Sequence, residues 1–351
     1  MENNAAFVDF RSDTVTKPTP QMREAMAAAE VGDDVYREDP SINRLQELAA
    51  EKMGKEAGLF IPSGTMGNLI AVLGHCGRGD EVIEGNLGHT FLFEGGGVAA
   101  LGSVHPNPLP TQPDGTLRLE DIRGAIRPSD DPHFPSTRLI VVENTHNRCG
   151  GVPLSVEYMD SVGALARETG LKLHLDGARI FNAAVALGVP AARLAEPVDS
   201  VTFCLSKGLC APVGSVLCGS RAFIDRARKI RKMLGGGMRQ AGVLAAAGTV
   251  ALETMVDRLE EDHCRARVLA QGLAKIPGMH VERENPPTNM VFAVLDERIS
   301  ATAPEVAARL AEQGVKVGAV GSRRFRLVTH HDVDDAAVEK ALAAFTAAMA
   351  F

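Results

Sequence analysis

Short apolar runs alternate with longer helical patterns across the middle of this 351-residue chain, and this alternation limits the folds that the chain can adopt. Each run has the length of a β-strand. A helical stretch between two consecutive runs lets the strands lie parallel in one sheet. The pattern therefore predicts an α/β fold, with a mostly parallel mixed sheet flanked by helices. The expected strands lie at 58–61, 81–83, 139–143, 171–175, 198–205 and 215–218.

The regions on either side of this pattern predict the remaining parts of the chain. Residues 1–18 have the pattern of an extended arm, and Thr19-Pro20 has the residue types of a helix N-cap and first helical position. We expect a large domain over 19–250, and a linking helix with a small C-terminal α+β domain over 251–351. The expected helices lie at 19–31, 41–53, 239–273 (broken or continuous), 304–313 and 333–349, and the expected C-terminal strands at 288–295, 315–320 and 325–329.

Lys207 and Asp176 stand where two of the predicted strands end. An ammonium group at the end of a buried strand loses hydration, and a lysine whose neutral amine is favoured can form a Schiff base with an aldehyde. The carboxyl ends of neighbouring parallel strands meet at one edge of the sheet, where ligands bind. An aspartate can hold the proton of a pyridinium ring, and a lysine can bind an aldehyde. Together they predict a site for pyridoxal 5'-phosphate (PLP).

The turn over residues 63–68 lies between an apolar run and a helical pattern, and it contains Ser63, Gly64 and Thr65. Small residues that open a helix offer backbone N–H groups to a phosphate. The Gly-Lys-Ser/Thr ending of a Walker loop is missing. Taken alone, the segment favours a plain helix N-terminus capped by Ser or Thr.

Two histidines are candidates for contact with a flat cofactor or a substrate hydroxyl. They are His89 and His146, and His146 follows the strand expected at 139–143, where ligands bind in this architecture. A lone histidine is more often a packed or surface residue, so neither assignment is secure from its own position. Zinc chemistry is not favoured, because no second pair completes a site with His146 and Cys149. The histidines at 330–331 are expected on the surface.

Two arginines are candidates for binding a carboxylate through a pair of parallel hydrogen bonds. Arg179 follows Asp176 in the segment His-Leu-Asp-Gly-Ala-Arg, and Arg326 lies between Phe325 and Leu327 on a predicted strand. Side chains alternate along a strand, so Arg326 faces away from its apolar neighbours, toward a cleft or water. A solvated arginine remains the commoner case.

The amino-acid composition argues against two classes of binding partner. A net charge of −7 and an aromatic content of 4% without Trp argue against nucleic acid and against an anionic membrane. The longest apolar stretch, near 241–252, is too short to span a bilayer. Six scattered cysteines without a Cys-x-x-Cys pair, and an N-terminus without a signal-peptide pattern, predict a cytoplasmic enzyme with free thiols.

Several segments taken together resemble the low-specificity L-threonine aldolases, which are PLP enzymes of fold type I. The resemblance runs from about residue 7 to residue 331. Arg37 departs from it, because the family usually has Gly at this position, between the Tyr and the Glu. The matching segments are Phe-Arg-Ser-Asp-Thr-Val-Thr at 10–16, Gly-Asp-Asp-Val-Tyr at 32–36, Glu-Asp-Pro at 38–40, Glu-Asn-Thr-His-Asn at 143–147, residues 174–181, residues 206–215 and Gly-Gly-Gly-Met-Arg-Gln at 235–240.

The resemblance implies a role for each matching residue. Lys207 would hold the cofactor aldehyde, and Asp176 would keep the pyridine nitrogen protonated. His89 would stack on the ring and help to hold the substrate hydroxyl, with His146 close to that hydroxyl. Gly64, Thr65 and a neighbouring subunit's Arg239 would bind the phosphate, and Ser206 would contact the cofactor. Ser12, Arg179 (also near the cofactor) and Arg326 would bind the substrate carboxylate. Tyr36 would enter the partner's site, and Thr14, Thr16 and Ser206 would lie near a cation.

The implied reaction is retro-aldol cleavage of L-threonine, L-allo-threonine and related β-hydroxy-α-amino acids to glycine and an aldehyde. His89, His146 or a water that they hold would act as the base. The implied assembly is a homotetramer with sites shared across a dimer interface. Two alternatives stay open: another fold type I enzyme acting on small amino acids, as a β-eliminating lyase or an aminotransferase, and a cofactor-binding protein without turnover.

Overall fold

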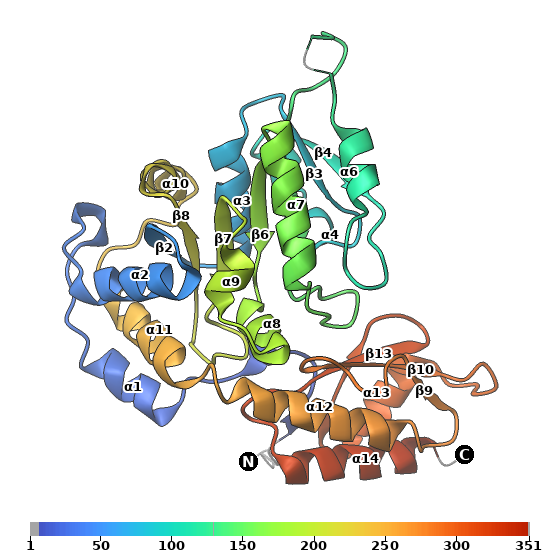
Figure 1. The fold of residues 1–351 in the computed structure, drawn as a ribbon. Helices are drawn as coiled ribbons and strands as arrows, with labels where there is room; N and C mark the ends of the chain where they lie inside the picture. The colour runs from blue at the N-terminus through green and yellow to red at the C-terminus, as the bar shows by residue number, and fades with distance from the viewer. Residues whose placement is uncertain (1–6, 129, 350–351) are drawn as a thin grey trace. The chain divides into compact units, whose positions relative to one another are not determined.

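The computed structural model describes residues 7–128 and 130–349 (Figure 1). The chain divides into two compact units. The large unit spans Pro18–Val256, and the small unit combines the segment up to Lys17 with the segment from Asp257 onward. No helix in the described ranges has the length and apolar character that crossing a membrane requires.

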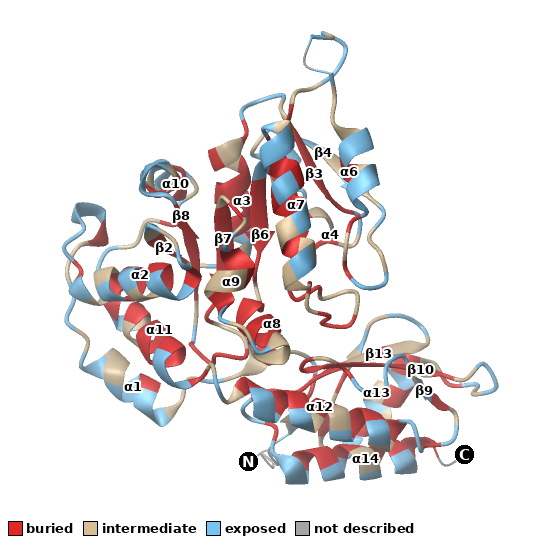
Figure 2. Ribbon diagram, in the orientation of Figure 1, coloured by how far each residue is buried: buried red, intermediate tan, exposed pale blue. Residues whose placement is uncertain are grey.

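The large unit contains a mixed, mostly parallel sheet with the strand order β2-β8-β7-β6-β5-β3-β4. Only β8 is antiparallel to its neighbours, and the other adjacent pairs are parallel. All six strands expected in this region are confirmed, and most of their residues are buried (Figure 2). The strands are β2 (Ala57–Ile61), β3 (Glu81–Gly85), β4 (His105–Leu109), β5 (Thr137–Glu143), β6 (Lys172–Asp176), β7 (Ser200–Cys204) and β8 (Ser215–Gly219).

Helices pack against this sheet through their apolar faces. Helices α3 and α10 cover a core that includes Leu59 of β2 and Leu217 of β8, and α7 contacts β6. The elements of the unit outside the sheet are α1 (Pro20–Ala27), η2 (Asp34–Tyr36), α2 (Pro40–Met53), α3 (Gly64–His75), α4 (His89–Leu92), α5 (Gly97–Ala100), α6 (Leu119–Ala125), α7 (Val156–Thr169), α8 (Ile180–Leu187), α9 (Ala191–Ala195), α10 (Arg221–Met233) and α11 (Gly242–Thr254).

The first two helices begin close to the predicted positions. The Thr19 hydroxyl accepts a hydrogen bond from the Met22 amide, with Pro20 in the first turn, as expected. Helix α1 ends at Ala27 and not near residue 31, because residues 28–31 supply no buried side chain that would hold another turn. Asp39 caps α2 through the Ile42 amide, and Gly54 ends it in a left-handed conformation.

The small unit is an α+β structure. Its antiparallel sheet has the order β12-β13-β10-β9, and β1 forms a separate parallel pair with β11. The rings of Phe325 and Phe345 meet edge to face at the centre of its core, with centroids 5.7 Å apart. Its elements are β1 (Val8–Asp9), η1 (Asp13–Val15), α12 (Leu259–Leu273), β9 (Met279–Val281), β10 (Met290–Leu295), α13 (Ala303–Glu312), β11 (Val315–Lys316), β12 (Gly318–Ala319), β13 (Arg324–Val328) and α14 (Asp335–Met349).

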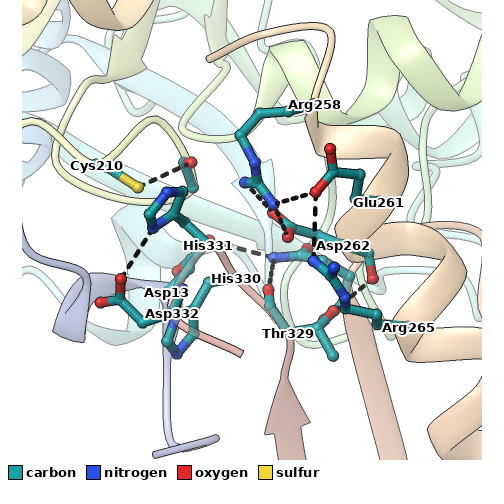
Figure 3. Close-up of polar contacts among 12 residues, drawn as sticks. Asp13, Cys210, Arg258, Glu261, Asp262, Arg265, Thr329, His330, His331 and Asp332 are labelled. Atoms are coloured by element: carbon teal, nitrogen blue, oxygen red, sulfur yellow. Dashed lines mark hydrogen bonds and ion pairs between the residues drawn. The ribbon is translucent and has the colours of Figure 1, made fainter. Parts of the chain in front are cut away.

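Two predictions for the small unit need correction. The strand expected over 315–320 is split, because β11 pairs with β1 whereas β12 pairs with β13. His330 is not on the surface: it is 1% exposed, and its ring contacts the Asp9 carbonyl oxygen at 2.8 Å. Thr329 beside it donates from its hydroxyl to the Asp262 carbonyl at 2.6 Å, and the Asp262 carboxylate pairs with Arg258 (Figure 3).

Candidate functional site

The candidate site lies at the carboxyl ends of three neighbouring parallel strands of the large unit. Glu143 at the end of β5 is the register partner of Asp176 at the end of β6, and Asp176 is the register partner of Thr202 in β7. Lys207 follows β7 in the turn that leads to β8. The helices α8 and α9 connect β6 to β7, so Asp176 and Lys207 terminate adjacent parallel strands, as the sequence predicted.

Asp176 is buried and held by hydrogen bonds on both carboxylate oxygens. The Asn68 side-chain amide donates to Oδ2 at 2.9 Å, and the Ala178 backbone amide donates to Oδ1 at 3.1 Å. Each carboxylate oxygen can accept more than one hydrogen bond, so Asp176 retains capacity for a further donor. The two bonds fix the orientation of the carboxylate without occupying it fully.

His89 and Glu94 form the second cluster of the site. His89 opens α4, and its backbone N–H donates to Glu143 Oε2 at 2.7 Å. Its Nδ1 lies 2.9 Å from Glu94 Oε1, and Asn68 Nδ2 donates to the same oxygen at 2.8 Å. The hydrogen bond that the ring donates to Glu94, opposed by burial and supported by the charge of Asp176, raises the pKa of His89. Burial raises the pKa of Glu94, although His89 opposes the shift.

A chain of buried hydrogen bonds reaches Asn68 from the other end of the sheet. The Asn68 amide nitrogen faces two carboxylates, so Oδ1 faces His174 Nε2, at 3.1 Å. His174 therefore carries its proton on Nε2 and accepts at Nδ1 from the Ser200 hydroxyl, at 2.9 Å. His75 Nε2 then donates to Ser200 Oγ, at 2.8 Å. Burial lowers the pKa of His174 to about 4 and that of His75 to about 3, so both rings are neutral at pH 7.

The turn that carries Lys207 has a defined backbone. The Cys210 amide donates to the Lys207 carbonyl at 2.9 Å, and Cys210 has a left-handed φ of 64°. Its Sγ lies 3.5 Å from the Gly208 carbonyl oxygen (Figure 3). Gly214 closes the turn with φ 103°, where a Cβ would meet the Phe60 ring at 2.5 Å. Glycine is therefore required for the chain to return into β8.

The turn at 63–68 forms the capped helix N-terminus that its sequence favours. Ser63 Oγ accepts from the Met66 amide at 3.2 Å, at the start of α3. Gly64 and Thr65 occupy the first two positions of this helix, where backbone N–H groups have no partner within the helix. A Cβ at Gly64 would lie 3.0 Å from Cys204 Sγ, so the helix end sits tightly against β7.

His146 and Arg179 are both buried in the large unit. His146 follows β5 and is 2% exposed, and its amide donates to the Val152 carbonyl at 2.9 Å. Gly115, with φ 82°, packs against it, since a Cβ there would lie 2.8 Å from His146 Cβ. Arg179 precedes α8 and is 8% exposed. His146, Asp176 and Glu143 line a narrow cavity together with Gly85, Gly88, Thr90, Thr111, Gly115, Leu117, Val141 and Val142.

The remaining predicted site residues are distributed over both units. In the small unit, Ser12 caps η1, and Arg326 donates from Nη2 to the Arg11 carbonyl at 3.0 Å. In the large unit, Tyr36 is 72% exposed and Arg239 pairs with Asp33 at 3.0 Å. Burial alternates along β13, so Arg326 faces away from the buried Phe325 and Leu327, as predicted. Thr14 and Thr16 belong to the small unit and Ser206 to the large unit.

Sequence reasoning missed three side chains that organise the site. Asn68 lies in the small-residue turn, Glu94 in no predicted element and Glu143 at the end of a predicted strand, so the local pattern marks none of the three as a site residue. Their contacts join positions 26, 54 and 108 residues apart, which no local pattern reveals. The available signal was a single glutamate between Phe93 and the glycine run at 95–97, in otherwise apolar surroundings.

Comparisons with known proteins agree on the class of this chain. Residues 9–297 match the family model described as Beta-eliminating lyase. The chain is 53% identical over 340 residues to the "Probable low-specificity L-threonine aldolase 2" of Arabidopsis thaliana, covering 96% of both chains. Among solved structures, the Leishmania major threonine aldolase superposes with a TM-score of 0.81 at 22% identity, covering 97% of this chain and 99% of that one. A structure titled SPT with PLP internal aldimine superposes with a TM-score of 0.74 at 18% identity, covering 97% and 87%.

Proposed function

The chain belongs to the low-specificity L-threonine aldolase family, within the β-eliminating lyases, and from this membership we propose that it cleaves L-threonine and L-allo-threonine to glycine and acetaldehyde with PLP. Its fold is the type I fold of PLP enzymes. The observation that carries the proposal is the pair of strand ends that bring Asp176 and the Lys207 turn to one edge of the sheet.

The residues present fit PLP. Asp176 is a buried carboxylate with remaining acceptor capacity, which suits a protonated pyridine nitrogen. The N-terminus of α3 offers backbone N–H groups of Gly64 and Thr65 to a phosphate. Lys207 supplies the amine. The bond from His89 to Glu94 uses Nδ1, so the second ring nitrogen, Nε2, is not used in that bond. Asp176 and His89 are drawn together from different elements by Asn68 and Glu94, which supports a single binding site for a flat ring.

We assign the reaction to these residues as follows. When bound, PLP accepts the electron pair that is released at the substrate Cα. Asp176 would stabilise the positive charge on the pyridine nitrogen, and Lys207 would hold the cofactor covalently in the resting enzyme. His89, His146 or a water that they hold takes the proton from the substrate hydroxyl, which lets the Cα–Cβ bond break. Ser12, Arg179 and Arg326 bind the substrate carboxylate and set the orientation in which that bond, and no other, is cleaved.

The wider proposal includes the assembly. We propose a homotetramer in which Arg239 reaches the phosphate in a neighbouring subunit and Tyr36 enters the partner's site, and a cytoplasmic location. The high exposure of the Tyr36 ring supports an intermolecular role, because a large aromatic side chain gains from burial. The six cysteines, all of them free thiols, support a reducing compartment. A cation near Thr14, Thr16 and Ser206 remains part of the proposal.

The test is a product assay on matched substrates. Protein saturated with PLP should release acetaldehyde from L-threonine and L-allo-threonine, and benzaldehyde from L-phenylserine. Borohydride reduction should place the cofactor mass on the peptide that contains Lys207. The Lys207→Ala variant should lose the visible absorbance of the lysine-bound cofactor and the aldehyde product. Lys172→Ala is the control, because Lys172 lies at the other end of β6 in an exposed pair with Asp199.

A β-elimination reaction is the second candidate, and the family model named for that reaction favours it. A β-eliminating enzyme would release pyruvate and ammonia from serine. Pyruvate without any aldehyde from the three hydroxy amino acids would replace the first proposal with the second. Absence of all these products, with the cofactor still bound through Lys207, would leave an aminotransferase, which would form a keto acid and pyridoxamine phosphate, or a cofactor-binding protein without turnover.

A further inference from the structure

The Glu94 carboxylate has no role in the reaction as assigned above, although it is built firmly into the site. It is 8% exposed, and Oε1 accepts hydrogen bonds from the Asn68 amide at 2.8 Å and from His89 Nδ1 at 2.9 Å. Glycines 95 and 96 follow it with φ of 63° and 67°, a left-handed pair that turns the chain sharply after Glu94. The local backbone is therefore adapted to direct this carboxylate inward.

The amide of Asn68 makes this arrangement specific. One nitrogen, Nδ2, donates to both Glu94 and Asp176, and the orientation of the amide is fixed by His174 on its other side. An amide nitrogen that donates to two carboxylates stabilises both as anions. The imidazole of His89 is thus hydrogen-bonded to the Glu94 carboxylate. The buried Asn68 amide holds this carboxylate, and the buried His174 holds the amide in turn.

The charged groups around His89 favour the same state of the ring. His89 Nδ1 donates to Glu94, Glu143 accepts from the His89 backbone amide, and the charge of Asp176, at the end of β6, also acts on the ring. Oxygens of Glu94 and Asp176 lie within 4.8 Å of each other and of a ring nitrogen of His89. The charge of Glu94 also contributes to raising the pKa of Glu84, whose carboxylate accepts a hydrogen bond from the Thr90 hydroxyl. Three carboxylates, those of Glu94, Asp176 and Glu143, therefore favour the protonated state of this imidazole.

We propose that Glu94 is a positioning residue: anchored by Asn68, its carboxylate fixes the imidazole of His89, holds a proton on Nδ1 and stabilises the doubly protonated ring, so that the other ring nitrogen, Nε2, donates a hydrogen bond toward the substrate. This proposal rests on the role assigned to His89 in the retro-aldol reaction. A ring that already carries both protons cannot accept another. Glu94 thereby leaves His146, or a water that it holds, as the base.

The decisive measurement uses the protein without cofactor. The titration of His89 is followed by NMR of histidine-labelled protein, with the His89 resonance assigned from the spectrum of His89→Asn. Replacing Glu94 by Gln keeps the size of the side chain and removes its charge. The midpoint of the His89 titration should fall by about one pH unit in Glu94→Gln, since an adjacent opposite charge shifts a titration by one unit or more. An unchanged midpoint overturns the proposal.

Glu84→Gln is the matched control, because Glu84 is equally buried but bonds to Thr90 and not to the imidazole. Its His89 titration should stay within a few tenths of a unit of wild type. A fall as large as that in Glu94→Gln would mean that any buried charge acts alike, which contradicts a specific role for Glu94. If Glu94→Gln fails to fold, imidazole nitrogen shifts of the wild-type protein at pH 7 serve instead. They should show protonated Nδ1, and an unprotonated Nδ1 overturns the proposal.

The pH profile of the loaded enzyme tests the donor role. An enzyme that needs protonated His89 loses activity above the pKa of that ring, so Glu94→Gln should move the alkaline limb of kcat/KM to lower pH. An unmoved limb beside a shifted titration would overturn the donor role. A wild-type protein that cleaves no hydroxy amino acid would overturn the proposed function. The titration in the cofactor-free protein would still decide whether Glu94 holds the proton on His89.

Discussion

Asp34 is expected to contribute more to stability than any surface ion pair of the large unit. It is 1% exposed and accepts from two guanidinium groups: Arg231, itself 2% exposed, and Arg228 at 3.4 Å. Arg231 has one further acceptor, the Phe60 carbonyl at 2.7 Å. Burial, and after it the charge of Arg231, lower the pKa of Arg228. The two cations are therefore buried at a cost that the carboxylate of Asp34 offsets.

Replacing Asp34 by Asn removes the charge and leaves both guanidinium groups without an anion. Breaking a buried pair from one side costs about 3–5 kcal/mol. For a unit of this size that corresponds to a fall of roughly 10 °C in Tm. Urea unfolding of the cofactor-free protein should show the loss directly. Asp33→Asn is the control: it keeps the cap on η2 and loses only a pair with the half-exposed Arg239, worth less than about 1 kcal/mol. Equal losses in both variants would refute the reasoning.

Three further outcomes are expected. Arg37 has φ 63°, so Arg37→Gly should be more stable than Arg37→Ala by about 1 kcal/mol in urea unfolding, because both lose the exposed pair with Asp225 and only glycine relieves the left-handed backbone. Burial raises the pKa of Glu84 to about 7, so the folded protein binds more protons than the unfolded chain between about pH 4.5 and pH 7, and stability falls as pH rises through that window. Glu84→Gln should therefore unfold like wild type at pH 5 and gain up to about 3 kcal/mol at pH 8; a gain at both pH values would contradict this. Arg326→Ala should weaken glycine binding by at least tenfold as measured by absorbance, whereas Arg324→Ala, on the same face of β13 but paired with Glu282, should not.

The parallel sheet was predictable because its strands are buried on both faces and therefore appear as continuous apolar runs. The exception is β4, at the edge of the sheet, which pairs only with β3. Its sequence, His-Pro-Asn-Pro-Leu, contains two prolines, Pro106 and Pro108, which argue against a strand unless the strand is an edge. Nothing in the sequence alone places this segment at an edge, so the strand was missed.

The site was predictable where its chemistry coincides with a strand end. Lys207 and Asp176 stand out because a charged residue after an apolar run is unusual, and the architecture then brings the ends together. His330 shows the opposite case. It was expected on the surface because its neighbours in the sequence are polar, but its partner is the Asp9 carbonyl, 321 residues away. A contact of that range is fixed by the fold of the small unit and leaves no mark in the local pattern.

The buried hydrogen-bond chain behind the site has a simple geometric origin. Asn68 and His75 are seven residues apart in α3, so they lie on one face of the helix, two turns from each other. That helix contacts β6 and β7, where His174 and Ser200 are partners in register. One helix face and one strand pair therefore hold the four side chains of the chain that ends at Asp176 and Glu94. Because the Asn68 amide nitrogen must donate to the two carboxylates, its oxygen must accept from His174, and the direction of each later hydrogen bond in the chain follows.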